Sequence, residues 1–167
     1  MNSVFFYRLL TTVFFSLLSF TLFAQRPIDD LVAKYQAHPK TGMEIFVMTE
    51  ETKDEMVTIM SRFDASPSLL SADYYRNLMD YKVIGCTGTE AKMLYDEVVD
   101  FFDTKDGYTT SRSRIGNMRS KGYTLISKDK DGNTVKETNT VMFALPDEND
   151  TDQQPNAVVM TIVTKED

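Results

Sequence analysis

The chain has 167 residues and carries 25 acidic against 18 basic side chains, a formal net charge of −7 at pH 7. This balance argues against a general nucleic-acid binder, because such proteins concentrate positive charge against phosphates. A single cysteine cannot form an internal disulfide, and one cysteine with one histidine supplies too few ligands for a zinc site. We therefore expect neither a disulfide framework nor a bound metal or other cofactor.

Residues 1–24 differ in composition from the rest of the chain. Arg8 is their only charged side chain, and their apolar run ends at Ala24. A basic start, a short apolar run and a small final residue are typical of a secretory signal peptide, with the mature protein beginning at Gln25. An uncleaved anchor in the inner membrane is the alternative. Cleavage would leave residues 25–167 as a single exported domain, periplasmic or secreted, without stable insertion in a membrane.

The mature region opens with a predicted helix and strand. Residues 27–38 place apolar side chains at helical spacing, and Pro27 suits a first helical turn, where its missing N–H costs nothing. The side chains that we expect this helix to bury are Ile28, Leu31, Val32 and Tyr35. His38-Pro39 ends the helix. Residues 43–48 are almost continuously apolar, which predicts a central strand.

Two further helices are predicted before the second strand. Residues 50–63 follow an acidic first turn with apolar side chains at helical spacing, namely Met56, Ile59, Met60 and Phe63. After a break at Pro67, Ser71 can cap a shorter helix that carries Tyr74, Tyr75, Leu78 and Met79. Residues 81–86 then predict the second strand.

The most regular helical pattern begins after Thr89, the predicted N-cap, and ends before Gly107. Its broad apolar stripe consists of Met93, Leu94, Val98, Phe101 and Phe102. Leu94, Val98 and Phe101 follow the spacing i, i+4, i+7. We therefore predict that Phe101 is more buried than Phe102.

The C-terminal part predicts a β-meander. Residues 108–115 alternate Arg112 and Arg114 with serines, which is typical of an edge strand. Asp131-Gly132 lies between two alternating runs and predicts a hairpin, since Gly takes the positive φ of a tight turn. The returning strand places Val135, Val141, Phe143 and Leu145 on one face and Thr134, Lys136, Thr138 and Thr140 on the other. Residues 156–164 predict the last strand.

The C-terminal alternation also predicts the layers of the fold. A sheet with one solvent-exposed, polar face must bury its other, apolar face. The long helix candidates with an apolar stripe lie between Glu50 and Thr104. We therefore predict an α+β fold of two layers, with helices on one face of a mostly antiparallel sheet that ends in a C-terminal β-meander.

The order of these segments resembles a family of small exported bacterial proteins, known mainly from Bacteroides-like organisms, whose function is unassigned. The segments that carry the resemblance are the helix end at residues 33–35, the strands at 42–48 and 81–84, the helix that runs into Gly107-Tyr108, the turn and strand at 131–137, and the closing strand at 158–162. The resemblance covers nearly all of residues 25–167. It implies export and an α+β sheet domain, and it implies no catalytic residues.

Cys86 is the first candidate for chemistry. It precedes the predicted cap Thr89 by three residues, where a helix N-terminus can lower the pKa of a thiol and make it reactive. No second cysteine exists, and the only histidine, His38, is distant in the sequence. A buried, unreactive Cys86 and a surface His38 are the preferred interpretation. With no Gly-x-Ser-x-Gly motif, a serine hydrolase triad built on His38 has no support.

Asp129, Asp131 and Asn133 have the spacing that opens a calcium-binding loop. Such a loop requires Gly at its sixth position and Glu at its twelfth, where this chain has Thr134 and Thr140. We therefore interpret the segment as a turn. A second acidic segment could also collect a cation, although such segments are more often simply solvated. Its acidic residues are Asp147, Glu148, Asp150 and Asp152.

Tyrosines are the remaining candidates for a ligand-binding face. They are Tyr74, Tyr75, Tyr81, Tyr95, Tyr108 and Tyr123. Without tryptophan the usual stacking platform for sugars is weak, so packing in the core or at a sheet edge is the preferred interpretation. A carboxylate pair for glycoside cleavage is also conceivable, but 25 acidic residues always offer such pairs.

We therefore expect an exported, non-catalytic binding or interaction module whose partner is an unknown envelope protein or small ligand. No catalytic, cofactor-binding or metal-binding residue is assigned. The alternative is a periplasmic hydrolase-type enzyme with acid/base carboxylates that the sequence does not identify. A pocket with two inward carboxylates would favour the enzyme, and a flat sheet face with an exposed apolar patch would favour the module.

Overall fold

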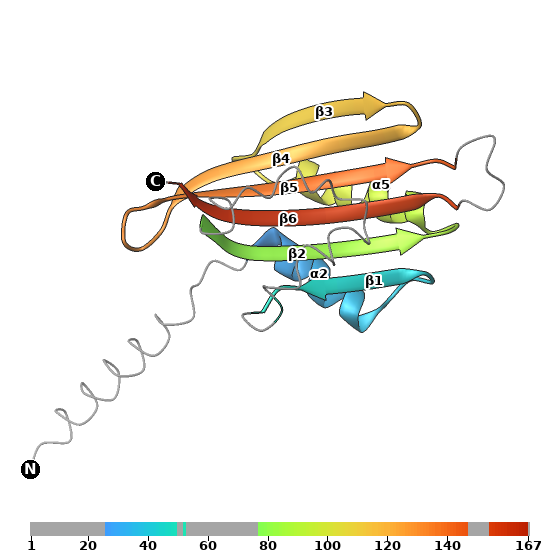
Figure 1. The fold of residues 1–167 in the computed structure, drawn as a ribbon, viewed down its shortest axis with the longest axis horizontal. Helices are drawn as coiled ribbons and strands as arrows, with labels where there is room; N and C mark the ends of the chain where they lie inside the picture. The colour runs from blue at the N-terminus through green and yellow to red at the C-terminus, as the bar shows by residue number, and fades with distance from the viewer. Residues whose placement is uncertain (1–25, 50–51, 53–76, 147–153, 167) are drawn as a thin grey trace, which may run out of the picture.

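The computed structural model describes residues 26–49, 52, 77–146 and 154–166. Within these residues the chain forms two α-helices and six β-strands (Figure 1). The helices are α2 (Pro27–Ala37) and α5 (Ala91–Asp103). The strands are β1 (Met43–Val47), β2 (Leu78–Thr87), β3 (Thr109–Ile115), β4 (Met118–Lys128), β5 (Thr134–Ala144) and β6 (Asn156–Glu166).

The six strands form one antiparallel sheet in the order β1-β2-β6-β5-β4-β3. The strands from β3 to β6 pair in sequence order, and β6 also pairs with β2. At the β4–β5 turn Gly132 has a φ of +83°, as the Asp131-Gly132 pair predicted. The prediction of an α+β fold with a C-terminal meander is confirmed, and β3 is the edge strand that its arginines indicated.

The larger apolar core lies between the sheet and the two helices, which cover the same face (Figure 1). α2 begins at Pro27 and buries all four residues that its spacing predicted, Ile28, Leu31, Val32 and Tyr35. The buried side chains of α5 are Ala91, Leu94, Val98 and Phe102. From the sheet they meet side chains such as Ile84, Val141 and Val159. Burial of this apolar surface is the main stabilising contribution to the fold.

The opposite face of the sheet is divided into an apolar and a polar half. A second buried cluster lies over β2 and β6 and consists of Leu78, Tyr81, Val83, Val158, Met160 and Ile162. Over β4 and β5 the same face carries the half-buried side chains of Thr124, Thr138 and Thr140, so the alternation predicted the polar side chains of this face correctly but not their full exposure to solvent. Apart from Thr52, the helix predicted over residues 50–63 lies outside the described residues, as does the pair Tyr74 and Tyr75.

β1 is an edge strand, so the prediction of a central strand is wrong. Its apolar run has a different cause. Ile45 and Val47 pack on the helix-side core, whereas Phe46 packs on the second cluster. A strand covered on both faces is almost continuously apolar wherever it lies in the sheet. β2 begins at Leu78, so Leu78 and Met79 belong to this strand and not to the helix predicted before it.

α5 presents a different face to the sheet than the sequence predicted. Phe102 is buried, Phe101 is only half-buried, and Met93 is exposed. The residues at the centre of the buried stripe are Ala91, Leu94, Val98 and Phe102. The prediction failed because it gave weight to the large Met93 and none to Ala91, which moved the expected centre toward Phe101.

Two predictions at element ends are also wrong. The N-cap of α5 is Glu90 and not Thr89, because a turn closes first, with the N–H of Ala91 donating to the carbonyl oxygen of Gly88 at 3.1 Å. Leu145 lies beyond the end of β5, where strand alternation no longer sets its direction, and it is 45% exposed. No helix in the described part of the chain is long and apolar enough to cross a membrane.

Candidate functional site

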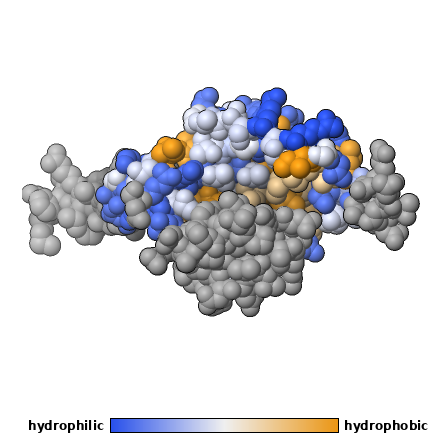
Figure 2. Space-filling view, turned by 45° about the horizontal axis from the view of Figure 1, so that its top comes forward, coloured by the Kyte–Doolittle hydropathy of each residue, from blue (hydrophilic) through white to orange (hydrophobic). Residues whose placement is uncertain are grey.

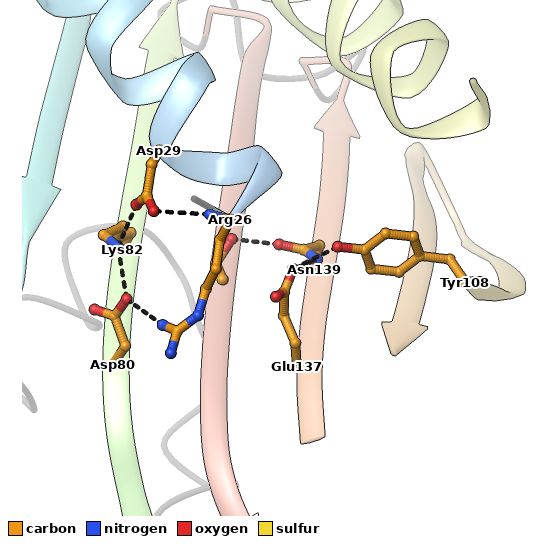
Figure 3. A network of polar contacts seen from close by, with 8 residues as sticks. Arg26, Asp29, Asp80, Lys82, Tyr108, Glu137 and Asn139 are labelled. Carbon is orange, nitrogen blue, oxygen red and sulfur yellow. Dashed lines mark hydrogen bonds and ion pairs between the residues drawn. The ribbon is translucent and has the colours of Figure 1, made fainter. Parts of the chain in front are cut away.

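Polar side chains cross the helix-covered face of the sheet at one end of the core. Glu137 and Asn139 of β5 share this face with Val141. The register aligns Asn139 with Thr161 of β6 and Thr161 with Lys82 of β2. Together with Asp80, Tyr108 and two residues at the start of α2, these side chains form what we call the polar network (Figure 3). Its eight members are Arg26, Asp29, Asp80, Lys82, Tyr108, Glu137, Asn139 and Thr161.

One half of the polar network fastens the start of α2 to β2. The Lys82 Nζ donates to Asp29 Oδ1 and to Asp80 Oδ2, each at 2.6 Å, and Arg26 Nη1 reaches the same Asp80 oxygen at 2.6 Å. The backbone N–H of Arg26 donates to Asp29 Oδ2 at 3.0 Å, which closes the first turn of the helix. Burial opposes the charge on Lys82, but the hydrogen bonds to Asp29 and Asp80 outweigh it and raise the pKa of Lys82.

The other half of the polar network surrounds the carboxylate of Glu137, which is 7% exposed. Tyr108 Oη and Asn139 Nδ2 both donate to Glu137 Oε1 at 2.7 Å, and Thr161 Oγ1 donates to Asn139 Oδ1 at 2.5 Å. In the part of the chain that the structure describes, Glu137 forms no ion pair with a lysine, arginine or histidine side chain. It is therefore a buried carboxylate stabilised by neutral donors.

Tyr108 connects the two halves electrostatically. Burial, and then its hydrogen bond to Glu137, raise the pKa of Tyr108 well above its ordinary value of 10.0. The positive charge of Arg26 acts on the same hydroxyl in the opposite direction. At neutral pH Tyr108 therefore stays protonated and remains a hydrogen-bond donor to Glu137.

The directions of these pKa shifts suit a structural role of the polar network better than a role in proton transfer. A general acid or base works best when its pKa lies near the operating pH. The shifts instead hold Tyr108 neutral and Lys82 charged at neutral pH. The carboxylates of Asp80 and Glu137 do share one face, because both residues align with Val163 of β6. Each carboxylate, however, accepts at least two hydrogen bonds from its neighbours.

Two further polar contacts fasten α5. Glu97 accepts hydrogen bonds from Tyr35 Oη at 2.7 Å, Lys34 Nζ at 3.1 Å and Lys40 Nζ at 3.2 Å. These three donors join α5 to α2 and to the loop that follows α2.

At the C-terminal end of α5, Asp103 accepts hydrogen bonds from Tyr123 Oη at 2.9 Å and from the Nζ of Lys121, which is 5% exposed. The hydrogen bond from Lys121 is the largest cause that lowers the pKa of Asp103. This contact joins α5 to β4.

Cys86 is buried and free, and it lies within 3.6 Å of the carbonyl oxygen of Thr41. Burial, and then the nearby charge of Glu90, raise its pKa, which is the opposite of what an activated thiol requires. His38 lies at the C-cap of α2 and is exposed. No contact joins Cys86 to His38 among the described residues. The predicted burial of Cys86 and exposure of His38 are confirmed.

The possible calcium ligands form the β4–β5 turn. The carboxylate of Asp129 accepts the N–H of Asp131 at 2.9 Å, the N–H of Asn133 at 2.8 Å and the Asn133 side-chain amide at 2.9 Å. The described residues contain no group of three or more His, Cys, Asp or Glu side chains placed to hold a metal ion. The acidic residues Asp147, Glu148, Asp150 and Asp152 lie outside the described residues.

The tyrosines of the described region pack into the protein rather than forming one face. Tyr81 and Tyr123 are buried on opposite faces of the sheet, and Tyr95 is half-buried with its ring 5.8 Å from that of Phe143. Tyr108 is half-buried and belongs to the polar network.

Sequence reasoning missed Glu137 and Asn139. Their signal was present in β5, where two polar residues interrupt the face that Val135, Val141 and Phe143 define. Polar residues on a buried face require partners. The sequence therefore indicated a polar site at Glu137 and Asn139, but it did not show which residues contact them.

Comparison with known proteins adds no family or function. No protein-family model matches the chain, and no curated protein matches it significantly.

Proposed function

We propose that this protein is an exported, non-catalytic binding or interaction module of the cell envelope, periplasmic or secreted. Its partner would be an envelope protein or a small ligand. The observation that carries this proposal is the internal pairing of the polar network. Its charged and polar side chains are hydrogen-bonded to one another, as in a scaffold that presents other surfaces to a partner.

Export is supported by the composition of residues 1–24, with one charged side chain before an apolar run that ends at Ala24. N-terminal sequencing of the protein from the envelope fraction should find Gln25 as the first residue. Recovery of the intact Met1 terminus would contradict cleavage and favour a retained anchor.

A second candidate function is that of a periplasmic hydrolase-type enzyme. One observation favours it. Asp80 and Glu137 place carboxylates on the same face of the sheet, on either side of β6, and Glu137 is buried without an ion pair in the described region. A buried carboxylate beside a second one is a common source of acid/base pairs.

Affinity capture tests the binding module. Tagged protein comprising residues 25–167 is incubated with solubilised envelopes, and recovered partners are purified and titrated against it by calorimetry. An unrelated acidic protein of similar size serves as the control, because it shares the general charge. The proposal predicts saturable binding of at least one purified partner, and absence of any such binding would contradict it.

The variants Glu137→Gln and Asp80→Asn distinguish the two candidates. If the protein is a binding module, the apparent affinity of each variant for its partner should fall only as far as the fraction of folded protein falls. In an enzyme, loss of a general acid or base lowers turnover by about 10² to 10⁴ while the fold persists. A panel of chromogenic glycoside, ester and peptide substrates supplies the activity measurement.

A further inference from the structure

The β3–β4 hairpin carries an unusual concentration of positive charge for an acidic protein. On the helix side of the sheet Arg112 lies directly opposite Lys121, and Arg114 lies directly opposite Arg119. Like charges in directly opposed positions destabilise a pair of strands. The chain as a whole has a net charge of −7, so the local charge of this hairpin is opposite in sign to that of the protein.

Only part of this charge is compensated within the described residues. Lys121 is paired with Asp103, and the charge of Arg112 contributes to the low pKa of Asp103. Arg114 and Arg119 are exposed and form no ion pair in the described part of the chain. The side chain of Arg114 only donates to the carbonyl oxygen of Gly116, at 3.4 Å. These two arginines are therefore available to a partner.

Exposed apolar side chains lie at the same end of the hairpin. Ile115, next to Arg114 at the turn, is 67% exposed, the highest value among the large apolar side chains of the described residues. Leu145 is 45% exposed, and its N–H donates to the carbonyl oxygen of Asn117 in the turn at 3.3 Å. The turn lies at the right of Figure 1, beside the end of β5. Figure 2, with the β3 side turned toward the viewer, shows hydrophobic patches beside strongly hydrophilic ones.

We propose that this hairpin end docks on a membrane surface that contains anionic phospholipids. Ile115 and Leu145 enter the interfacial layer, while Arg114 and Arg119 contact lipid phosphates. Arginine is suited to this role because its guanidinium group can bind phosphate through two hydrogen bonds. The proposal rests on the proposed export, and it names one partner surface for the binding module.

Two exposed arginines beside exposed apolar side chains favour this partner. At the opposite end of the sheet the exposed cations are lysines, and Lys128 donates to Thr134 Oγ1 at 2.7 Å. An acidic peptide would satisfy the arginines but would leave Ile115 exposed to water. A membrane interface accepts both kinds of side chain, since binding there combines buried apolar area with attraction to anionic lipids. The protein's net negative charge opposes this contact, and four acidic residues, Asp147, Glu148, Asp150 and Asp152, follow Leu145 closely in the sequence. Docking therefore requires that the attraction of Arg114 and Arg119 to lipid phosphates exceed this repulsion within the screening distance of about 10 Å.

Vesicle co-sedimentation tests the proposal with protein comprising residues 25–167. The vesicles are phosphatidylcholine alone or phosphatidylcholine mixed with phosphatidylglycerol. We expect binding to the mixed vesicles that weakens in high salt. Arg114→Gln with Arg119→Gln should reduce the partition coefficient about thirtyfold, and Ile115→Ser should reduce it about tenfold.

The opposite end of the sheet offers a matched control. Ile126 is 63% exposed there, and Lys128 and Lys130 are exposed beside the β4–β5 turn. Ile126→Ser and the pair Lys128→Gln with Lys130→Gln should leave vesicle binding within twofold of wild type. Equal losses at both ends would contradict the proposal, because they would show general attraction rather than docking through the hairpin.

Stability measurements separate this role from a structural one. Removing the arginine pair should leave the urea midpoint unchanged or slightly higher, since it relieves like-charge repulsion. A lower midpoint together with unchanged vesicle binding would show that the arginines serve the fold, and would overturn the proposal. Tight binding of polyglutamate that is indifferent to Ile115→Ser, without vesicle binding, would overturn it in favour of an acidic polypeptide. Capture of an envelope protein is measured separately, so failure here leaves the proposed binding module standing.

Discussion

The ring of Phe102 in α5 stacks on the ring of Tyr123 in β4, with the centroids 5.1 Å apart and the planes inclined by 27°. Tyr108 packs edge-on against both rings, at 5.7 Å from Phe102 and 6.4 Å from Tyr123. Tyr123 and Tyr108 in turn bind Asp103 and Glu137. The ring of Phe102 in α5 therefore packs against both tyrosines, the one that binds Asp103 and the one that binds Glu137.

Phe102→Ala should cost about 3 to 5 kcal/mol in free energy of unfolding, because it removes a buried aromatic ring from a packed cluster. Phe101→Ala should cost clearly less, since Phe101 is half-buried and Lys105 lies over its ring. Urea unfolding of the two variants checks this order. An equal loss, or a larger loss for Phe101→Ala, would contradict the observed orientation of α5.

The general fold could be predicted because its causes are local. Alternation in β5, the Asp131-Gly132 turn and the apolar spacing of α2 each encode one element without reference to its neighbours. The orientation of α5 could not be predicted in the same way. The sequence does not show whether Ala91 or Met93 lies on the buried side of α5. The packing of α5 on the sheet buries Ala91 and leaves Met93 exposed.

The site was harder to predict because its members come from distant segments. Arg26 and Asp80 are 54 positions apart, and Tyr108 and Glu137 are 29 positions apart. The sequence shows that Glu137 and Asn139 interrupt an apolar face, but not which residues they meet. Strand order supplies that information, because β6 places Thr161 between Asn139 and Lys82.

Asp103 and Lys121 should behave as a coupled pair. Asp103→Ala leaves the buried ammonium of Lys121 without its carboxylate, and we expect a loss of about 1 to 3 kcal/mol, reduced because Asp103 is itself partly exposed. Adding Lys121→Met removes the unpaired charge and should restore part of this loss. Strictly additive losses in urea unfolding would contradict the coupling.

Acidification should destabilise the protein through Glu97. Burial alone would raise the pKa of Glu97, but hydrogen bonds from Tyr35, Lys34 and Lys40 outweigh it and lower the pKa below its ordinary value of 4.5. A carboxyl whose pKa falls on folding stabilises the native state fully above its unfolded pKa and loses this contribution as the pH falls through the folded pKa. Urea midpoints should therefore decline below about pH 4.5, and Glu97→Gln should reduce that decline. Identical acid profiles for wild type and variant would contradict this assignment.

Calcium should not change the stability of the protein. The Asp129 carboxylate is already occupied by donors from Asp131 and Asn133, so an ion would have to displace them. Melting temperatures with EDTA and with millimolar calcium should agree. A clear rise with calcium would contradict the prediction, because an ion that binds only the native state raises its stability.

We propose that the polar network stabilises the fold, and a double-mutant cycle on Tyr108 and Glu137 tests this proposal most directly. Tyr108→Phe keeps the ring that packs on Phe102 but removes the hydroxyl donor, and Glu137→Gln removes the charge that accepts it. We predict that each variant loses about 1 to 3 kcal/mol of unfolding free energy. The double variant should lose about 1 kcal/mol less than the sum, because the two residues share one hydrogen bond. Single variants as stable as wild type, or more stable, would contradict the claim, since that is the behaviour of groups that a fold retains for activity at the expense of stability.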